Sequence, residues 1–229
     1  IPTDFGGTMI YVPRNFDERY HGPVRLRTAL ASSLNVPATA LAADLGVKRF
    51  ASFLLDLGFE SIESGVQGGY PNAGLGIALG NSPVSLFELV RGFSVFPRGG
   101  EYIDLSWNRF SDPADGTGNQ STRQVVSRTT ADIVSHILMD PFERTLGFGM
   151  DDPFDVNFPV MVKTGTASRY QNIWALASAG DFTIGIWLGN FSGETVIGRT
   201  GSSVPASIAL EVLAELPGVM MEVTGFQET

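Results

Sequence analysis

Two short polar runs, 130 residues apart, carry side chains that could do chemistry. Lys163-Thr164-Gly165-Thr166 ends an apolar stretch that predicts a β-strand. A lysine with neighbouring hydroxyls can bind a carboxylate, and a glycine beside them leaves room for a substrate backbone. Ser33-Leu34-Asn35 follows a predicted helix. Taken alone, the first run is equally typical of a plain strand end, and the second of a helix C-terminal cap.

The elements that must position these runs follow from apolar spacing, prolines and glycines. Helices are predicted from Pro23 to near Asn35 and at Ala38–Leu45, Val47–Leu57, Ser82–Phe96, Ser127–Met139 and Val204–Leu216. Strands are predicted at Phe158–Thr166, Asn172–Ser178 and Phe182–Asn190. Strands followed by a helix indicate an antiparallel meander covered by helices, an α/β fold of the α+β type.

The same patterns predict where one of these helices begins and which residues share a face of the others. Pro83 would open the fourth helix with Ser82 as its N-cap. Ile133, Ile137 and Val134 would face inward from the fifth. Ile208, Val212 and Leu216 lie roughly in register on the last helix.

Composition excludes several classes of function. The chain has 229 residues, with 24 acidic and 15 basic side chains and a net charge of −9, which argues against a general nucleic-acid binder. There are no cysteines, which excludes thiol catalysis, disulfides and cysteine-ligated metals. The only histidines are His21 and His136, too few for a histidine-rich metal site. No cofactor or metal is predicted, and no stretch approaches the roughly 20 apolar residues of a membrane span.

In this order and on these elements, the two polar runs match two of the three motifs of penicillin-recognising serine enzymes. The resemblance extends to four further segments: Tyr11–Asp17, Gly22–Ala38, the region around Trp174, and Gly185–Gly189. Together they are similar to the transpeptidase domain of class A penicillin-binding proteins, and the Trp174 segment most resembles the 1C subtype. The resemblance covers residues 10–40, 70–100 and 155–215.

The resemblance implies a D,D-transpeptidase that cross-links peptidoglycan stem peptides ending in D-Ala-D-Ala and is acylated by β-lactams. It implies the fold of penicillin-binding proteins and serine β-lactamases, an antiparallel sheet flanked by helices. Lys163, Thr164 and Thr166 would bind the substrate carboxylate, with clearance at Gly165, and the Thr166 N–H would serve an oxyanion hole. Ser33 would shuttle a proton between the leaving amine and a lysine base, and Asn35 would bind the substrate amide and orient that lysine.

One departure from the family pattern concerns the nucleophile, which lies in a Ser-x-x-Lys motif. The two lysines here, Lys48 and Lys163, are preceded at the third position by Leu45 and Val160, so the motif is absent. We therefore interpret residues 1–229 as a partial transpeptidase domain that is inactive alone. The nucleophile helix and a glycosyltransferase domain would lie upstream.

Such a fragment would expose apolar faces meant for its missing half. It is therefore expected to be unstable, to oligomerise or to bind that half. The intact protein would work at the periplasmic face of the bacterial inner membrane. Its anchor would lie in another segment, without membrane contact from this one.

Other interpretations remain open from the sequence. The missing motif also fits a non-catalytic module that binds peptidoglycan or β-lactams, and the shared motifs fit a serine β-lactamase or D,D-carboxypeptidase-like hydrolase. Trp174 and Trp187 are typical of a sheet core, or could stack on a substrate. Gly74–Gly80 lacks the spacing and the lysine of a nucleotide loop.

Overall fold

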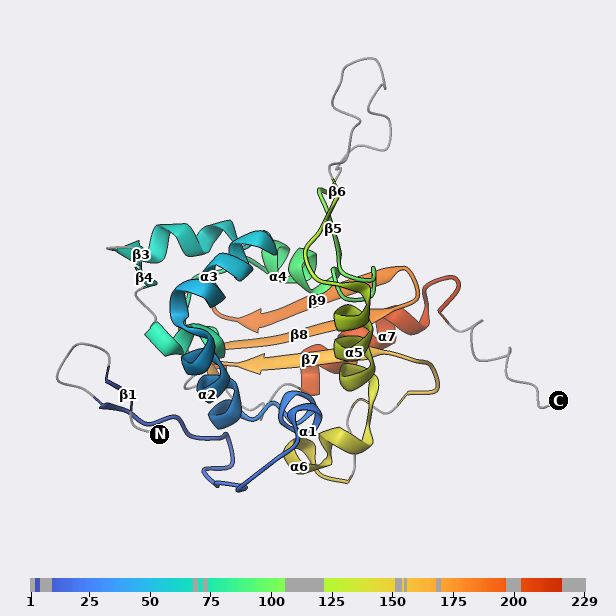
Figure 1. Ribbon diagram of the computed structural model, residues 1–229. Helices are drawn as coiled ribbons and strands as arrows, with labels where there is room; N and C mark the ends of the chain where they lie inside the picture. Colours follow the sequence, from blue (N-terminus) through green and yellow to red (C-terminus); the bar gives the residue numbers. More distant parts are fainter. Residues whose placement is uncertain are drawn as a thin grey trace, which may run out of the picture.

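The computed structural model describes residues 3–4, 10–67, 70–71, 74–105, 122–150, 154, 156–167, 170–196 and 203–219 (Figure 1). Its α-helices are α1 (Leu26–Ala31), α2 (Asn35–Leu45), α3 (Val47–Asp56), α4 (Leu86–Phe93), α5 (Arg128–Met139), α6 (Thr145–Phe148) and α7 (Ser203–Ala214). The 3-10 helices are η1 (Glu60–Gly65), η2 (Gly74–Leu79) and η4 (Phe142–Arg144). Within these described ranges, no helix has the length and apolar character needed to cross a bilayer.

The main sheet is an antiparallel meander of β7 (Met161–Thr166), β8 (Asn172–Ala179) and β9 (Phe182–Gly189), in the order β7-β8-β9. It confirms the predicted meander and its turn, where Gly180 takes a positive φ of 53°. The other strands form short antiparallel pairs: β1 (Thr3–Asp4) with β2 (Ile10–Tyr11), β3 (Val66–Gln67) with β4 (Tyr70–Pro71), and β5 (Glu101–Ile103) with β6 (Thr122–Gln124).

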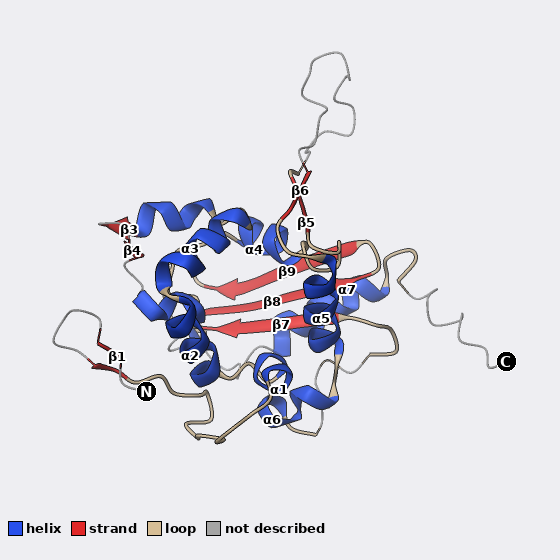
Figure 2. Ribbon diagram, viewed as in Figure 1, coloured by secondary structure: helices blue, strands red, loops and turns tan. Residues whose placement is uncertain are grey.

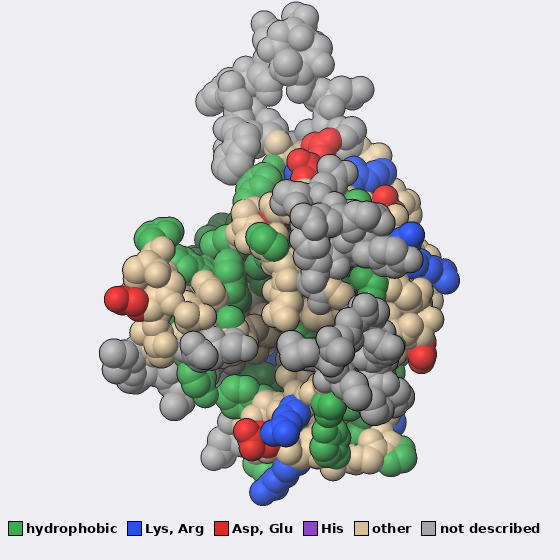
Figure 3. All heavy atoms as spheres, turned by 90° about the vertical axis from the view of Figure 1, so that its left-hand side faces the viewer, with side chains coloured by type: hydrophobic (Ala, Val, Ile, Leu, Met, Phe, Trp, Pro, Cys, Tyr) green, Lys and Arg blue, Asp and Glu red, His purple; other side chains and the backbone are tan. Residues whose placement is uncertain are grey.

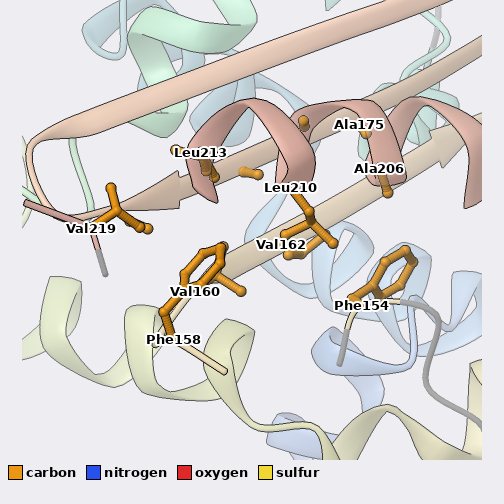
Figure 4. Packing of buried hydrophobic residues seen from close by; sticks show 12 residues of the cluster. Phe154, Phe158, Val160, Val162, Ala175, Ala206, Leu210, Leu213 and Val219 are labelled. Carbon is orange, nitrogen blue, oxygen red and sulfur yellow. The ribbon is translucent and has the colours of Figure 1, made fainter. Parts of the chain in front are cut away.

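Helix α7 covers one face of the sheet (Figure 4). Its buried residues pack on alternate residues of β7 and β8 and are Ala206, Ala209, Leu210 and Leu213. Ile208 and Val212, predicted to lie in register on this helix, are 42% and 44% exposed and so lie away from the buried face. The two alanines on the buried face let the helix approach the sheet closely, so the small residues rather than the β-branched ones face inward.

The opposite face of the sheet carries α1, α4 and α5, so helices lie on both faces (Figure 2). Met161 and Leu176 pack there against Phe93 and Leu138. Helix α4 lies directly on β9, because a Cβ at Gly185 would come within 2.4 Å of Val90. A second apolar cluster joins α3, η1, η2 and β5 beside this layer.

Three helix starts differ from the prediction. Helix α1 begins at Leu26 rather than Pro23, and it ends at Ala31 rather than near Asn35. Helix α4 begins at Leu86 rather than Pro83, because Ser85 and Glu88 form a reciprocal capping box. Helix α2 begins at Asn35 and includes Pro37. A proline is tolerated there because the first helical N–H groups need no partner within the helix.

The predicted inward face of α5 was right at Ile137 and at Val134, which packs against the cluster on the sheet, and wrong at Ile133. Ile137 is buried, whereas Ile133 is 54% exposed. Ala131 and Leu138 occupy the rest of the buried face. Ser127, predicted as the first residue of the helix, is its N-cap, and its hydroxyl accepts a hydrogen bond from the Thr130 N–H.

Candidate active site

The side chains of Lys163 and Ser33 meet, although 130 residues separate them in the sequence. Lys163 Nζ donates a hydrogen bond to Ser33 Oγ at 2.6 Å and another to the carbonyl oxygen of Thr164 at 2.7 Å. Both Lys163 and Ser33 are partly buried. The two polar runs seen in the sequence therefore lie at one place in the fold.

Lys163 is the cation of this site. Burial lowers the pKa of its ammonium from the ordinary 10.5 to about 8, because removal from water disfavours the charged form. A group with that pKa is still mostly charged at pH 7. A partly desolvated cation of this kind is favourable for an anionic ligand such as a carboxylate.

The strand β7 places its polar residues on different faces. Lys163 and Gly165 share the face that carries α1 and α5, whereas Thr164 is 9% exposed on the face toward α7. At Gly165 a Cβ would meet only Trp174, at no less than 3.8 Å, so the space above this residue is open. Thr166 ends the strand and is exposed. A ligand can therefore approach β7 most closely at Gly165.

Ser33 closes helix α1 in a Schellman motif. The Leu34 N–H donates to the Ala29 carbonyl at 2.9 Å, and the Ser33 N–H donates to the Leu30 carbonyl at 3.1 Å. Ser33 has a φ of +55°, the left-handed conformation that glycine usually supplies at this position. The expectation of a helix cap is thus confirmed together with the contact to Lys163.

Asn35 lies at the start of α2, one residue beyond this turn. Its Nδ2 donates to the Arg14 carbonyl at 2.9 Å, while the buried Asn15 accepts at its Oδ1 from the Val36 N–H at 3.0 Å. These bonds tie residues 14–15 to the beginning of α2. The structure therefore places Asn35 next to the site, with its amide nitrogen bonded to Arg14.

An aromatic cluster lies beside Gly165. Trp174 pairs with Gly165 across β7 and β8, and with Trp187 across β8 and β9. The two indole rings are 6.1 Å apart, and Phe191 lies 5.1 Å from the ring of Trp187. Trp187 also donates to the Asn172 side chain at 3.0 Å. Both tryptophans are partly buried, so they belong to the edge of the core.

The described ends of β7 and β9 point to the side of the molecule where α2 lies (Figure 1). Figure 3 shows that side with a hollow near its centre and hydrophobic side chains along one border.

The chain matches the family described as the penicillin binding protein transpeptidase domain over residues 10–184. That span contains both polar runs. The chain belongs to this family.

Curated relatives are penicillin-binding proteins of class A. The chain is 31% identical over 214 residues to penicillin-binding protein 1C of Escherichia coli K12, covering 90% of this chain and 26% of the relative. It is also 31% identical to penicillin-binding protein 1A of Clostridium acetobutylicum, covering 79% of this chain and 22% of the relative. The chain thus spans about a quarter of the length of these relatives.

Solved structures share the fold. Penicillin-binding protein 1A of Haemophilus influenzae superposes with a TM-score of 0.73 at 20% identity, covering 95% of this chain and 38% of that one. The imipenem acyl-enzyme complex of penicillin-binding protein A from Mycobacterium tuberculosis gives 0.65 at 17% identity, covering 91% and 52%. These likenesses confirm the predicted fold class of an antiparallel sheet flanked by helices.

The transpeptidase family assignment and the class A resemblance are therefore confirmed, and the structure brings together Ser33 and Lys163. The roles expected for Asn35, Thr164, Gly165 and Thr166 stay predictions. Sequence analysis did not single out Ser32, Glu143 or Gly147, which contact one another beside Ser33. No local signal marks these three residues, because their contacts join segments more than 100 residues apart in the chain.

Proposed function

We propose that this chain forms part of the acyl-transfer site of a peptidoglycan D,D-transpeptidase. The observation that carries the proposal is the 2.6 Å contact between Lys163 Nζ and Ser33 Oγ, which joins the two family motifs. The attacking serine and its lysine would belong to a Ser-x-x-Lys segment outside these 229 residues, which contain no such motif. In this proposal residues 1–229 are one part of a transpeptidase domain, and a glycosyltransferase domain belongs to the same protein.

The residues present fit defined steps of this reaction. Lys163 and Thr166 would hold the terminal carboxylate of a D-Ala-D-Ala stem, and Gly165 would let its backbone lie against β7. The attacking serine would form an ester with the penultimate D-Ala carbonyl. The Thr166 N–H would stabilise the oxyanion that develops at that carbonyl.

Ser33 would transfer the proton in both halves of the reaction. The proton lost by the attacking serine would pass through the Ser33 hydroxyl to the nitrogen of the departing D-Ala. The amine of a second stem peptide would then attack the ester and return a proton by the same route. One C–N bond is broken and one is formed, so the exchange balances without a further reagent.

The charge of Lys163 supports this route. Its ammonium donates to Ser33 Oγ, which leaves the Ser33 proton free to point toward a substrate. Asn35, at the start of α2 just after the turn that carries Ser33, would bind the substrate amide. A β-lactam has a carboxylate beside a reactive carbonyl, and would enter the site by the same contacts.

The absence of Ser-x-x-Lys within residues 1–229 supports a second candidate, a non-catalytic module that binds stem peptides or β-lactams reversibly. A hydrolase of the serine β-lactamase or D,D-carboxypeptidase type would differ in releasing its acyl group rapidly to water. We place the transpeptidase on the extracytoplasmic face of the inner membrane, anchored by another segment of the protein.

Intact mass spectrometry tests the proposal. The full-length protein that contains this chain is incubated with benzylpenicillin, beside the 229-residue chain alone. We expect one stable adduct on the full-length protein, mapped by peptide analysis to a serine outside residues 1–229, and none on the chain alone. No adduct on either would support the binding module, and rapid loss of the adduct would support the hydrolase.

A further inference from the structure

The turn that carries Ser33 is held by a segment more than 100 residues away. Ser32 is buried, with 4% of its surface exposed, and its hydroxyl donates to the backbone carbonyl of Glu143 at 2.7 Å. Its own carbonyl lies against helix α6, since a Cβ at Gly147 would be 2.3 Å from the Ser32 oxygen and 2.9 Å from the Ser32 carbonyl carbon. Residue 32 is therefore contacted on its side chain and on its backbone by residues 143–147.

The backbone contact bears on the geometry of Ser33 itself. The Ser32 carbonyl belongs to the peptide group whose orientation sets φ of Ser33. A side chain at Gly147 would push this peptide group, whereas a glycine allows it to sit flat on α6. Because Ser33 is not glycine, its left-handed φ of +55° is strained and persists only where the surroundings determine it.

The holding segment is itself attached to α1. The Glu143 carboxylate accepts from Arg25 Nη2 at 2.7 Å and from the Thr28 hydroxyl. Residues 143–147 therefore contact α1 near its start, and again just after its end at Ser32. Helix α1 and its terminal turn are held as one unit against η4 and α6.

We propose that Ser32, the Glu143 carbonyl and Gly147 are positioning elements that keep Ser33 in the left-handed turn with its hydroxyl on Lys163. The inference rests on the proposed acyl-transfer function for its kinetic consequence. A Ser33 that relaxed to right-handed geometry would turn its side chain away from Lys163. The contacts of residues 143–147 oppose this relaxation, and so maintain an arrangement that the local sequence alone does not favour.

Two variants from different elements test the inference, Ser32→Ala and Gly147→Ala, in the full-length protein. Fluorescent penicillin gives the first-order acylation rate constant and the dissociation constant of the complex that precedes acylation. We expect the rate constant to fall by about tenfold or more in each variant, as for a misplaced reacting group. The dissociation constant should stay within about twofold, because Lys163 and Gly165 still bind the ligand.

Matched controls separate positioning from lost stability. Ser178→Ala removes a serine that is likewise buried and donates to a backbone carbonyl, that of Phe182 at 2.8 Å, at the far end of β8. Gly149→Ala imposes strain at a φ of +86° two residues beyond Gly147, where a Cβ would meet nothing within 4 Å. Both controls should lower the melting temperature and leave the acylation rate constant of the folded protein unchanged.

Crystal structures of Ser32→Ala and Gly147→Ala supply a readout that does not need activity. We expect φ of Ser33 to leave the positive region and its distance to Lys163 Nζ to exceed about 3.5 Å. If both variants keep the left-handed turn and acylate at the wild-type rate, the inference is overturned. If the wild-type protein is not acylated at all, the proposed function fails, and the two structures still decide whether residues 143–147 position Ser33.

Discussion

The two arms of the site are built by opposite means. Lys163 projects from a strand whose neighbours pack into apolar clusters on both faces of the sheet, so sheet register sets its place. Ser33 projects from a strained helix-ending turn that polar contacts and a close backbone approach hold in place. We call β7 with Lys163 the strand arm, and the turn after α1 with Ser33 the turn arm. The strand arm is therefore robust to small changes around it, whereas the turn arm depends on a few specific atoms.

Because of this difference, substitutions in the two arms should affect folding stability and ligand binding to different extents. Replacing a site residue on the strand should change ligand handling and leave folding nearly intact. Replacing a residue in the turn should change both, because backbone strain and side-chain chemistry coincide at Ser33.

The largest effect is expected at Lys163. Lys163→Ala should lower the acylation rate of the full-length protein by roughly 100-fold or more, because it removes the donor to Ser33 and the cation for the ligand carboxylate. Stability should not fall at neutral pH, since a partly buried ammonium with a lowered pKa opposes folding there. Stopped-flow fluorescence and thermal unfolding measure the two effects.

The sign of the pH effect at Lys163 follows from its pKa. The folded value of about 8 lies below the ordinary 10.5, so the unfolded chain binds more protons between these values and wild-type stability rises with pH across that window. Lys163→Ala should lose this rise. Lys48→Ala, at the other lysine of the chain, should keep both the rise and the acylation rate.

Glu88 sharpens the comparison, because its carboxylate joins the start of α4, the helix that packs on β9, to Ser61 and has no contact with Ser33 or Lys163 among its hydrogen bonds. Burial raises the pKa of its carboxyl, but hydrogen bonds from Ser85 and Ser61 outweigh that effect, and the net pKa is lowered below 4.5. Glu88→Gln should cost about 1–3 kcal/mol of unfolding free energy in urea at pH 7. The acylation rate of the folded protein should be unchanged.

The pH dependence gives a second readout for Glu88. A lowered folded pKa means that the stabilisation is complete above 4.5 and is lost as pH falls through the folded pKa. The wild-type protein should lose stability across that acidic range, and Glu88→Gln should lose less. Parallel curves for the two proteins would contradict the role assigned to this carboxylate.

Substitutions at Gly165 test whether a bound ligand occupies the open space above this residue of β7. Gly165→Ala and Gly165→Val should leave unfolding free energies within about 1 kcal/mol, because the nearest atoms to the new Cβ are 3.8 Å away and strands favour valine. The dissociation constant of the penicillin complex should rise stepwise, by about tenfold for valine. Unchanged binding in both variants would mean that the ligand does not lie against this residue.

The smallest effect concerns the strain in the turn arm. Ser33→Gly should be more stable to urea than Ser33→Ala by about 1 kcal/mol, because only glycine adopts the left-handed turn without cost. The same pair at Ser32, whose φ is −81°, should show the reverse order. Equal stabilities for the two Ser33 variants would show that the turn is not left-handed in solution.

The strand arm could be predicted from the sequence, and the turn arm only in part. The apolar run that precedes Lys163, and the short turn between the next two predicted strands, predicted the antiparallel meander, since strand pairing follows local pattern and short turns. Ser33 was recognisable as a helix cap and as a family motif. Its left-handed backbone and its support from Ser32 and Gly147 arise from packing between distant segments, which no periodicity records.

The errors in the predicted helices have the same origin. The spacing of Ile208 and Val212 predicted that they lie in register but not which face of α7 is buried, and Ala206 and Ala209 set the face that packs closely on the sheet. Ser82 was predicted as the N-cap of α4, but the reciprocal bonds between Ser85 and Glu88 make Ser85 the cap. In these helices a specific hydrogen bond or tertiary packing decided what the predicted spacing missed or left open.

A double-mutant cycle tests the central claim that Ser33 and Lys163 act as one unit. Acylation rate constants are measured for the full-length protein and its Ser33→Ala, Lys163→Ala and double variants. Coupled residues should show strong non-additivity, with the double variant little slower than the slower single variant. Factors that simply multiply in the double variant would contradict the account, because they would mean that the 2.6 Å contact between the two side chains has no part in the reaction.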